Sequence, residues 1–264
     1  MSEMLRGKCA LVTGSAGGGL GYALAAAFAG AGANVVLNGL CSVADGDAAA
    51  AALAEEHGIE AVFDPADLRK ESEIGRMVGA AVERFGCVDI LVNNAVVRHF
   101  AQIEEFDPAD WDASVGVNIT AAFHAVRHAL PAMKRRGWGR IINISSYYGW
   151  RGAENRIDYV TTKTALLGMT RAIAIETAPT GVTCNAICPG SVPTPAIMAR
   201  IEEIARDRGE PLEEVARDYA RQRSPTGRFV AMEHVGDLAV FLCSPASADI
   251  TGTTVPIDGG WLAA

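Results

Sequence analysis

The feature that most constrains the fold is a glycine-rich turn between a short apolar run and an Ala-rich segment. The run Lys8-Cys9-Ala10-Leu11-Val12 leads into Thr13-Gly14-Ser15-Ala16-Gly17-Gly18-Gly19-Leu20-Gly21, and the residues up to Gly30 favour a helix. Such a turn between a strand and a helix lets backbone N–H groups approach a pyrophosphate. Gly14 would begin the turn, and Gly19 and Gly21 would flank the phosphates and the start of the helix.

The alternation of strands and helices continues along the chain. Apolar runs predict further strands at 34–37, 60–63, 88–92, 140–144, 182–187 and 254–257. Helices are predicted at 44–57, 71–85, 111–136 and 159–177, with a kink or break at Pro131. This order predicts an α/β fold with a doubly wound parallel sheet and helices on both faces, because parallel strands need crossover connections. Ligands should then bind at the carboxyl ends of the strands.

The length of 264 residues, half of them hydrophobic, suits one α/β domain, and we expect residues 1–264 to form a single domain. One segment, residues 196–224, lacks a strand pattern and carries opposite charges four residues apart at Glu202/Arg206 and Glu213/Arg217. We expect a helical insertion over the strand ends. It is either a solvated helical hairpin or a lid that closes on substrate.

Charge and cysteine usage exclude several classes of partner. The formal net charge is −8 with no long basic run, so nucleic acid and anionic membrane surfaces are poor partners. The most apolar stretch, residues 22–37, contains Gly30, Gly32 and Asn34, and residues 1–8 are too short and polar for a signal peptide. The six scattered cysteines fit buried small side chains, and no partner ligands complete a metal set. We expect a cytoplasmic protein without a metal.

The segment after the second predicted strand bears on the choice of cofactor. Asn38-Gly39-Leu40-Cys41-Ser42 offers neither an acidic residue for a ribose diol nor a basic residue for a 2′-phosphate. A 2′-phosphate binds weakly where no cation is available to pair with it, so the segment favours NAD over NADP. After the third strand, Asp67 could accept a hydrogen bond from the adenine amino group, or it is an ordinary helix-capping residue.

Candidate reactive groups follow the fourth and fifth predicted strands. Tyr159 and Lys163 stand four residues apart and share one helix face. A phenol titrates near pH ~10, and a neighbouring ammonium with a positively charged nicotinamide would stabilise its phenolate. The phenol is then a general base for alcohol oxidation or a general acid for carbonyl reduction. Ser146 could hold the carbonyl oxygen, and Asn118 is a buried structural amide or a functional one.

Together these motifs resemble the short-chain dehydrogenase/reductase family along essentially the whole chain. The matching segments are Thr13-Gly14 to Gly21, Asn93-Asn94-Ala95, Asn118, Ser146, Tyr159 with Lys163, Pro189-Gly190 and Asp258-Gly259-Gly260. The resemblance implies a Rossmann-type fold with a seven-stranded sheet, a nicotinamide cofactor and a homotetramer. It also implies a catalytic set of Asn118, Ser146, Tyr159 and Lys163, in which Lys163 holds the nicotinamide ribose and Asn118 positions a proton-relay water.

The expected cofactor contacts span the whole strand-end rim. They are Gly14, Ser15, Gly19, Leu20, Gly21, Leu40, Asp67, Leu68, Asn94, Tyr159, Lys163, Pro189, Gly190, Val192 and Thr194. Two departures from the family pattern affect this rim. The glycine turn is one residue longer, with Ser15-Ala16-Gly17-Gly18 where the family has three residues, and Val96 replaces a glycine after Asn93-Asn94-Ala95. We expect a local shift of the backbone at these places.

Within the family, the chain resembles the D-3-hydroxybutyrate dehydrogenases, which use NAD. The similar segments are Val36-Leu37-Asn38-Gly39, Ile103-Glu104-Glu105-Phe106, residues 182–190, Phe241-Leu242-Cys243-Ser244 and Asp258-Gly259-Gly260-Trp261-Leu262. The positions that hold the substrate carboxylate in that group differ. Where the group has glutamine, histidine, lysine, tryptophan and glutamine, this chain has Arg98, Tyr148, Arg156, Ser191 and Arg200.

Three arginines still favour an anionic substrate, because a planar guanidinium binds a carboxylate or sulfonate with paired hydrogen bonds. Arg156 and Arg200 resemble the arginines with which 2-hydroxypropyl-coenzyme M dehydrogenases grip a sulfonate. We expect Arg98, Ser146, Tyr148, Arg156, Tyr159 and Arg200 to contact a small hydroxy acid or its sulfonate or dicarboxylate analogue. The alternative is that these arginines only form surface ion pairs.

The sequence thus predicts an NAD-dependent oxidoreductase that transfers a hydride between nicotinamide and the secondary alcohol or ketone of a small anionic substrate. A second hypothesis is an NADPH-dependent ketone or 3-oxoacyl-thioester reductase. A third is a non-catalytic dinucleotide-binding scaffold, which the complete set of reactive residues disfavours.

Overall fold

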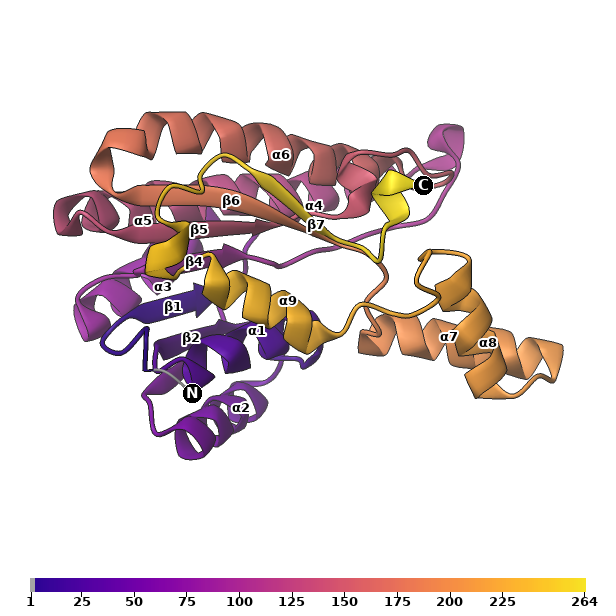
Figure 1. Cartoon of the computed structure of the whole chain (residues 1–264), viewed down its shortest axis with the longest axis horizontal. Coiled ribbons are helices and arrows are strands. Elements are labelled where there is room, and N and C mark those ends of the chain that lie inside the picture. The colour runs from indigo at the N-terminus through magenta and orange to yellow at the C-terminus, as the bar shows by residue number, and fades with distance from the viewer. Residues whose placement is uncertain (1–2) are drawn as a thin grey trace.

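The computed structural model describes residues 3–264 and contains a seven-stranded parallel sheet with helices on both faces, as Figure 1 shows. The strands are β1 (Cys9–Val12), β2 (Asn34–Asn38), β3 (Ala61–Asp64), β4 (Ile90–Asn93), β5 (Gly139–Ile144), β6 (Val182–Pro189) and β7 (Thr254–Ile257). They lie in the order β3-β2-β1-β4-β5-β6-β7, and every neighbouring pair is parallel. The predicted fold class is confirmed. The strand order reverses between β1 and β4, which is where this kind of sheet opens a crevice for a ligand.

The helices of the sheet layers are close to the predicted segments. They are α1 (Gly19–Gly30), α2 (Val43–His57), α3 (Glu71–Phe85), α4 (Pro108–Val115), α5 (Ala121–Arg136), α6 (Ile157–Thr177) and α9 (Met232–Phe241). The sequence analysis did not predict α9. It packs on α1 at Gly236, where an added Cβ would lie 2.7 Å from the Cβ of Ala27.

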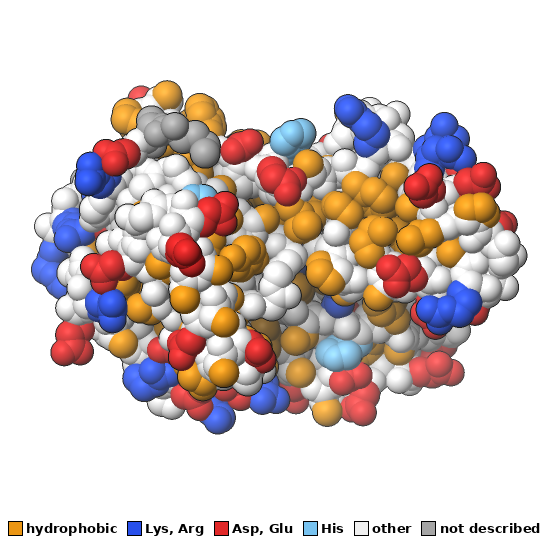
Figure 2. Space-filling view, turned by 90° about the horizontal axis from the view of Figure 1, so that it is seen from below, with side chains coloured by type: hydrophobic (Ala, Val, Ile, Leu, Met, Phe, Trp, Pro, Cys, Tyr) orange, Lys and Arg blue, Asp and Glu red, His pale blue; other side chains and the backbone are white. Residues whose placement is uncertain are grey.

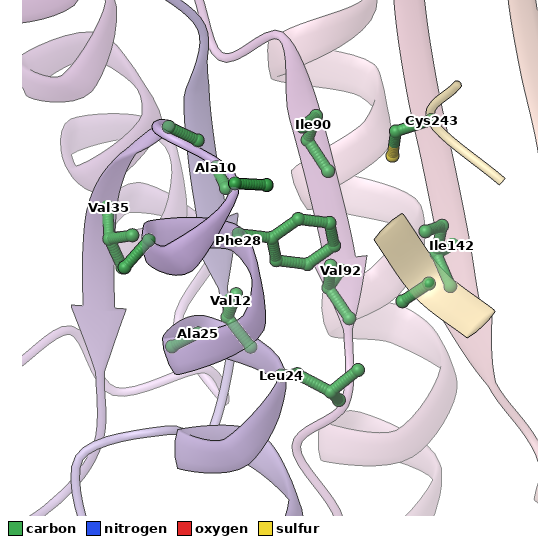
Figure 3. Packing of buried hydrophobic residues seen from close by; sticks show 14 of the residues in the cluster. Ala10, Val12, Leu24, Ala25, Phe28, Val35, Ile90, Val92, Ile142 and Cys243 are labelled. Atoms are coloured by element: carbon green, nitrogen blue, oxygen red, sulfur yellow. The ribbon is translucent and has the colours of Figure 1, made fainter. Parts of the chain in front are cut away.

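Two apolar cores lie on the two faces of the sheet, and β1 illustrates how the sequence divides between them. Successive side chains of a strand point to opposite faces. Ala10 and Val12 accordingly pack with Phe28 of α1, whereas Cys9 and Leu11 pack against the opposite cluster. Figure 3 shows the Phe28 ring between α1 and the central strands. All four residues of β1 are buried, so this strand is fixed by packing on both sides.

Of the two predictions at Pro131, a break is wrong, because α5 runs through this residue to Arg136, and a kink stays a prediction. Pro131 lies on the exposed face of α5, where water can bond the carbonyl group that loses its partner. The irregular turn comes earlier. Residues Gly116–Thr120 form a π-helical turn between α4 and α5, and such turns are frequent at functional sites.

The predicted helical insertion is a hairpin of α7 (Pro195–Arg208) and α8 (Leu212–Arg221). In Figure 1 it projects from the body of the molecule next to the carboxyl ends of the strands. It has a small core of its own, formed by Ile201, Ala205 and Val215. The helical character is confirmed, and closure of the hairpin on a substrate stays a prediction.

The surface charge, the helix lengths and the cysteines of the described residues bear on the classes of partner considered above. On the face shown in Figure 2, Lys and Arg side chains are scattered singly among Asp and Glu and form no continuous basic area. Among residues 3–264, no helix combines the length and the apolar character that crossing a bilayer requires. The six cysteines are free thiols, and all except the half-buried Cys41 are buried.

Candidate active site

A cleft of about 600 Å³ runs along the carboxyl ends of β1, β2, β4, β5 and β6. Its floor at β1 is the glycine turn, which enters α1 at Gly19. No side chain caps the N-terminus of α1, because the residue at the cap position is Gly18. The first N–H groups of the helix are therefore available to an anion, and the positive end of the helix dipole favours one there.

Gly14 and Gly21 fit a dinucleotide because the backbones meet here with no room for side chains. Gly14 has a φ of +63°, and an added Cβ would lie 2.8 Å from the Cα of Ala95. An added Cβ on Gly21 would meet the carbonyl oxygen of Gly14 and lie 2.6 Å from Nδ2 of Asn94. That Nδ2 donates to the carbonyl groups of Thr13, at 2.9 Å, and Gly14, at 3.0 Å. The end of β4 thus ties down the turn at which the pyrophosphate would bind.

The variant Gly21→Ala tests this close approach. We expect it to lower the free energy of unfolding by about 1–3 kcal/mol, because the methyl group displaces the turn. We also expect it to weaken cofactor binding by about tenfold or more, since one misplaced turn removes several hydrogen bonds. Thermal unfolding and fluorescence titration with NADH measure the two effects. The control is Gly79→Ala in α3, where an added Cβ meets nothing within 4 Å and should leave both values unchanged or slightly improved.

Among residues 3–264, the side chains that line the cleft beyond β2 and β3 are uncharged. Asn38 is buried, and its Nδ2 donates to the carbonyl groups of Asp64 and Ala66. Leu40 is 74% exposed at the mouth of the cleft. The Asp67 carboxylate accepts two hydrogen bonds from the side chain of Arg69, which lower its pKa to about 2. Asp67 does not line the cleft, whereas its neighbours Ala66 and Leu68 do.

The two departures from the family pattern are both accommodated. The longer turn places Gly18 and Gly19 in positive-φ conformations, and both line the cleft. Val96 also lines the cleft and is 41% exposed. Its φ is not positive, so the backbone at Val96 does not need the conformational freedom of glycine. Ser15 is fully buried and supports the turn from behind, donating to the Val12 carbonyl and accepting from the Asn38 N–H.

Lys163 and Tyr159 lie one turn apart on α6, as predicted. The Lys163 Nζ lies 5.6 Å from the centre of the Tyr159 ring and donates to the carbonyl oxygen of Ile144 at 2.6 Å. Burial lowers the pKa of Lys163 to about 8, and the positive charge of Arg98 acts in the same direction, whereas Cys188 opposes it. Ser146 is buried at the end of β5 and, with Tyr159, lines both the cofactor cleft and a second cavity.

Asn118 lies in the π-helical turn and binds the loop that follows β4. Its Oδ1 accepts from the Val97 N–H and its Nδ2 donates to the Val97 carbonyl, each at 2.9 Å. Its Nδ2 also donates to the hydroxyl of Thr162 on α6. Asn118 does not line the cleft, although its neighbour Val117 does. Its side chain therefore fixes the loop that carries Arg98, and the predicted proton-relay role of Asn118 stays a prediction.

The second cavity, of about 1080 Å³, adjoins the first at Arg98, Ser146 and Tyr159. Every residue predicted to contact substrate lines it, including Tyr148, Arg156 and Arg200. The sequence analysis missed Phe100, Tyr219 and Arg223, which also line it. Arg223 ends the charge-rich segment and follows Tyr219 by four residues, and this spacing is the signal that could have revealed the pair.

Arg156 and Arg200 of this cavity lie against aromatic rings and, among the described residues, form no ion pairs with carboxylates. The Cζ of Arg156 lies 4.2 Å from the ring centre of Phe100 and 4.6 Å from that of Tyr159. The Cζ of Arg200 lies 5.1 Å from the ring centre of Phe100. Among residues 3–264, neither guanidinium is within 4.0 Å of a carboxylate, nor is that of Arg98. The hypothesis of mere surface ion pairs is therefore not supported by the geometry.

Of the residues predicted to bind the cofactor, most line the first cleft. The structure brings together Gly14, Gly19, Leu20, Gly21, Leu40, Leu68, Asn94, Tyr159, Lys163, Pro189, Gly190, Val192 and Thr194, and it leaves Ser15 and Asp67 outside. The sequence analysis missed Asn38, Ala66 and the short segment from Ala95 to Val97 on the same walls. Asn38 and Ala66 have no distinctive sequence pattern, whereas Ala95 and Val96 follow directly from the Asn93-Asn94 segment that resembles the family.

This fold and this site define a class of nicotinamide-dependent oxidoreductases. A family model described as Enoyl-(Acyl carrier protein) reductase matches residues 14–262. The chain therefore belongs to the short-chain dehydrogenase/reductase family.

Individual relatives show which members of the family the chain resembles in sequence and in structure. The chain is 45% identical to a D-beta-hydroxybutyrate dehydrogenase of Cupriavidus necator over 98% of this chain and 100% of the relative. It is 42% identical to the enzyme of the same name from Rhizobium meliloti over 97% of this chain and 99% of the relative. Among solved structures, an L-sorbose reductase from Gluconobacter frateurii complexed with NADPH and L-sorbose has a TM-score of 0.94 at 30% identity, with 100% of both chains covered.

Proposed function

We propose that the protein is an NAD-dependent dehydrogenase that interconverts the secondary alcohol and ketone of a small hydroxy acid or hydroxy sulfonate. The observation that carries this proposal is the convergence of Arg98, Arg156 and Arg200 on a cavity that adjoins Tyr159 and Ser146. Guanidinium groups without carboxylate partners attract an anionic substrate and can bind it with paired hydrogen bonds. Two D-beta-hydroxybutyrate dehydrogenases among the relatives support a hydroxy acid.

A nicotinamide held in the first cleft by Gly14, Gly19 and Lys163 would supply the hydride acceptor for oxidation and the hydride donor for reduction. Tyr159 takes the hydroxyl proton during oxidation and donates it during reduction. The Lys163 ammonium, one helical turn further along α6, stabilises the phenolate electrostatically. The Ser146 hydroxyl donates to the substrate oxygen as negative charge develops on it. Asn118 keeps Val97 and, with it, the loop of Arg98 in place.

The test is a panel of small hydroxy carboxylates and hydroxy sulfonates, with NADH formation followed by its absorbance. We expect turnover of at least one anionic alcohol and much weaker turnover of its neutral counterpart, for example 3-hydroxybutyrate against its methyl ester. Equal kcat/KM for the acid and the ester would contradict the proposal.

The variants Arg156→Gln and Arg200→Gln test the anion-binding role directly. We expect each to raise KM for the accepted anion by about tenfold or more, since a hydrogen bond between charged groups contributes about 1.5–3 kcal/mol. KM for the methyl ester should stay unchanged. The matched control is Arg206→Gln, an exposed arginine of α7 outside the cavity. If KM for every accepted anion stays the same in both variants, the arginines do not bind substrate.

The preference for NAD is a separate prediction. In the part of the chain that the structure describes, no Lys or Arg side chain lies at the end of β2 to bind a 2′-phosphate. The Arg69 guanidinium is already paired with the Asp67 carboxylate. We expect kcat/KM to be about tenfold or more higher with NAD than with NADP. Leu40→Arg, which adds a cation at an exposed position of the cleft, should improve use of NADP, and steady-state kinetics with both cofactors measure this.

A second candidate is an NADPH-dependent ketone reductase. It is favoured by the solved L-sorbose reductase, which was complexed with NADPH. A strong preference for NADPH in the same kinetic comparison would support this candidate over the first.

A further inference from the structure

The second cavity contains more positive charge than one anionic group requires. Four arginines line it, namely Arg98, Arg156, Arg200 and Arg223, and the carboxylates on its walls are Glu154 and Glu203. In the part of the chain that the structure describes, none of these six side chains forms an ion pair within 4.0 Å. A single carboxylate would therefore leave the cavity with uncompensated positive charge.

The four arginines fall into two groups on different parts of the fold. Arg98, in the loop after β4, and Arg156, at the N-cap of α6, lie beside Tyr159 and Ser146. We call these two the inner pair. Burial lowers the pKa of Arg156, Tyr159 opposes this effect, and the positive charge of Arg98 adds to the lowering, so the two guanidinium charges act on each other. Among the described residues, the Nε of Arg156 is buried and has no hydrogen-bond partner.

Arg200 of α7 and Arg223, just beyond α8, form an outer pair on the helical hairpin. The Cζ of Arg223 lies 3.8 Å from the ring centre of Tyr219, and Phe100 lies against the guanidinium groups of both Arg200 and Arg156. Stacking on a ring fixes the plane of a guanidinium and leaves its N–H edge for an oxyanion. The Phe100 ring therefore contacts one arginine of each pair, namely Arg156 of the inner pair and Arg200 of the outer pair.

We propose that the substrate carries two anionic groups, one bound by the inner pair next to the reacting carbinol and one bound by the outer pair. The chemical class is a small hydroxy dicarboxylate. This inference rests on the proposed function and narrows its substrate. Two negative charges balance the net charge of the cavity walls, and a volume of about 1080 Å³ has room for a second acid group beyond a four-carbon hydroxy acid.

The experiment measures binding of unreactive acids to the enzyme–NADH complex by calorimetry. Linear dicarboxylates of four to six carbons are compared with monocarboxylates of equal length, for example glutarate with valerate. We expect the best dicarboxylate to bind about tenfold or more tightly than its monocarboxylate, since the second acid adds charged hydrogen bonds. The variant Arg223→Gln removes the one arginine of the cavity that the proposed function does not use. It should reduce this difference severalfold and change monocarboxylate binding less than twofold. Arg206→Gln should change neither.

Two results overturn the inference and separate it from the proposed function. If monocarboxylates bind as tightly as dicarboxylates, the substrate has one anionic group and the proposed function still stands. If no acid of either series binds and neither hydroxy acids nor hydroxy sulfonates are oxidised, the proposed function fails as well.

A different observation carries a second inference. The carboxylate of Asp158 has no exposed surface and lies next to the loop that carries Arg98. Its Oδ2 accepts from the Ser114 hydroxyl at 2.7 Å and from the His99 N–H at 3.0 Å, and its Oδ1 accepts from the Tyr159 N–H at 2.6 Å. The His99 ring lies 3.4 Å from both the Asp158 and the Asp110 carboxylates. The carboxylate thus joins the loop after β4 to the first turn of α6.

We infer that Asp158, Ser114 and His99 are positioning residues for Arg98. Asn118 binds the backbone of Val97, and Asp158 binds the backbone of His99, so the backbone of Arg98 is held on both sides. Loosening one side would let the Arg98 guanidinium move relative to Tyr159. A displacement of that kind should weaken binding of the anion without disturbing the cofactor cleft.

The variants Ser114→Ala and Asp158→Asn test this role. We expect KM for the anionic substrate to rise by about fivefold or more while the NADH dissociation constant changes less than twofold. The control is Ser247→Ala, an equally buried serine remote from the site, which should leave KM unchanged. If both constants rise in proportion, or if KM stays constant, the residues support the fold only and the inference is wrong.

Discussion

Tyr159→Phe lowers kcat by about 10²–10⁴-fold, because the variant retains the ring but loses the group that exchanges the proton. The ring contacts with Arg156 and Tyr148 do not involve the hydroxyl, so the fold and the substrate cavity should remain intact. We therefore expect the dissociation constant for NADH and the binding of unreactive acids to change less than about twofold. Steady-state kinetics and calorimetry on the same preparation measure both.

The matched control for this loss is Tyr148→Phe. Tyr148 lines the same cavity and its ring lies 6.2 Å from that of Tyr159, but it has no proposed role in proton transfer. It should retain most of kcat. An equally large loss in both variants would mean that the cavity tolerates no change of polarity, and it would remove the special role of Tyr159.

Lys163→Met is expected to lower kcat/KM by about 10²-fold or more, because the phenolate loses its neighbouring cation. The limb of the oxidation profile that rises with pH should move to higher pH, since a cation favours the charged form of the phenol. The measurement is kcat/KM from pH 6 to pH 10 in both proteins. An unchanged profile would show that Lys163 does not act on Tyr159.

The same variant, Lys163→Met, is expected to lose activity but not stability at pH 7. Burial lowers the pKa of Lys163 from its usual value to about 8, so below pH 8 the folded protein holds a charge that the unfolded chain carries more easily. This costs about 3 kcal/mol at pH 7, and the cost falls as pH rises from 8 toward ~10. We expect stability of the ligand-free protein to rise with pH in that window. In Lys163→Met the rise should be absent and the unfolding temperature at pH 7 should not fall.

The sheet and most helices were predictable because their patterns are local. The strands are short runs of apolar residues, and the helices α2 and α3 start and end within one residue of the predicted bounds. The positions of the proposed catalytic residues were predictable because Tyr159 and Lys163 have a fixed spacing on one helix, and because Ser146 lies just beyond the end of a strand. Their catalytic roles stay predictions.

Other features depend on distant parts of the chain and leave little local signal. The π-helical turn around Asn118 follows from bonds to Val97 and Thr162, which lie in other elements. The Asp158 carboxylate is held by a hydrogen bond from Ser114, which lies 44 residues earlier in the chain. Arg223 joins the cavity only because the helical hairpin folds back over the strand ends. Tertiary contacts of this kind cannot be derived from periodicity.

The central claim is that this chain moves a hydride between the carbinol carbon of an anionic hydroxy acid and a nicotinamide. The most direct measurement uses the accepted hydroxy acid with deuterium on its carbinol carbon, followed by mass analysis of the NADH formed. The account predicts that every NADH carries one deuterium and that turnover slows with the labelled substrate wherever hydride transfer limits the rate. Unlabelled NADH, with the deuterium found in water, would contradict it.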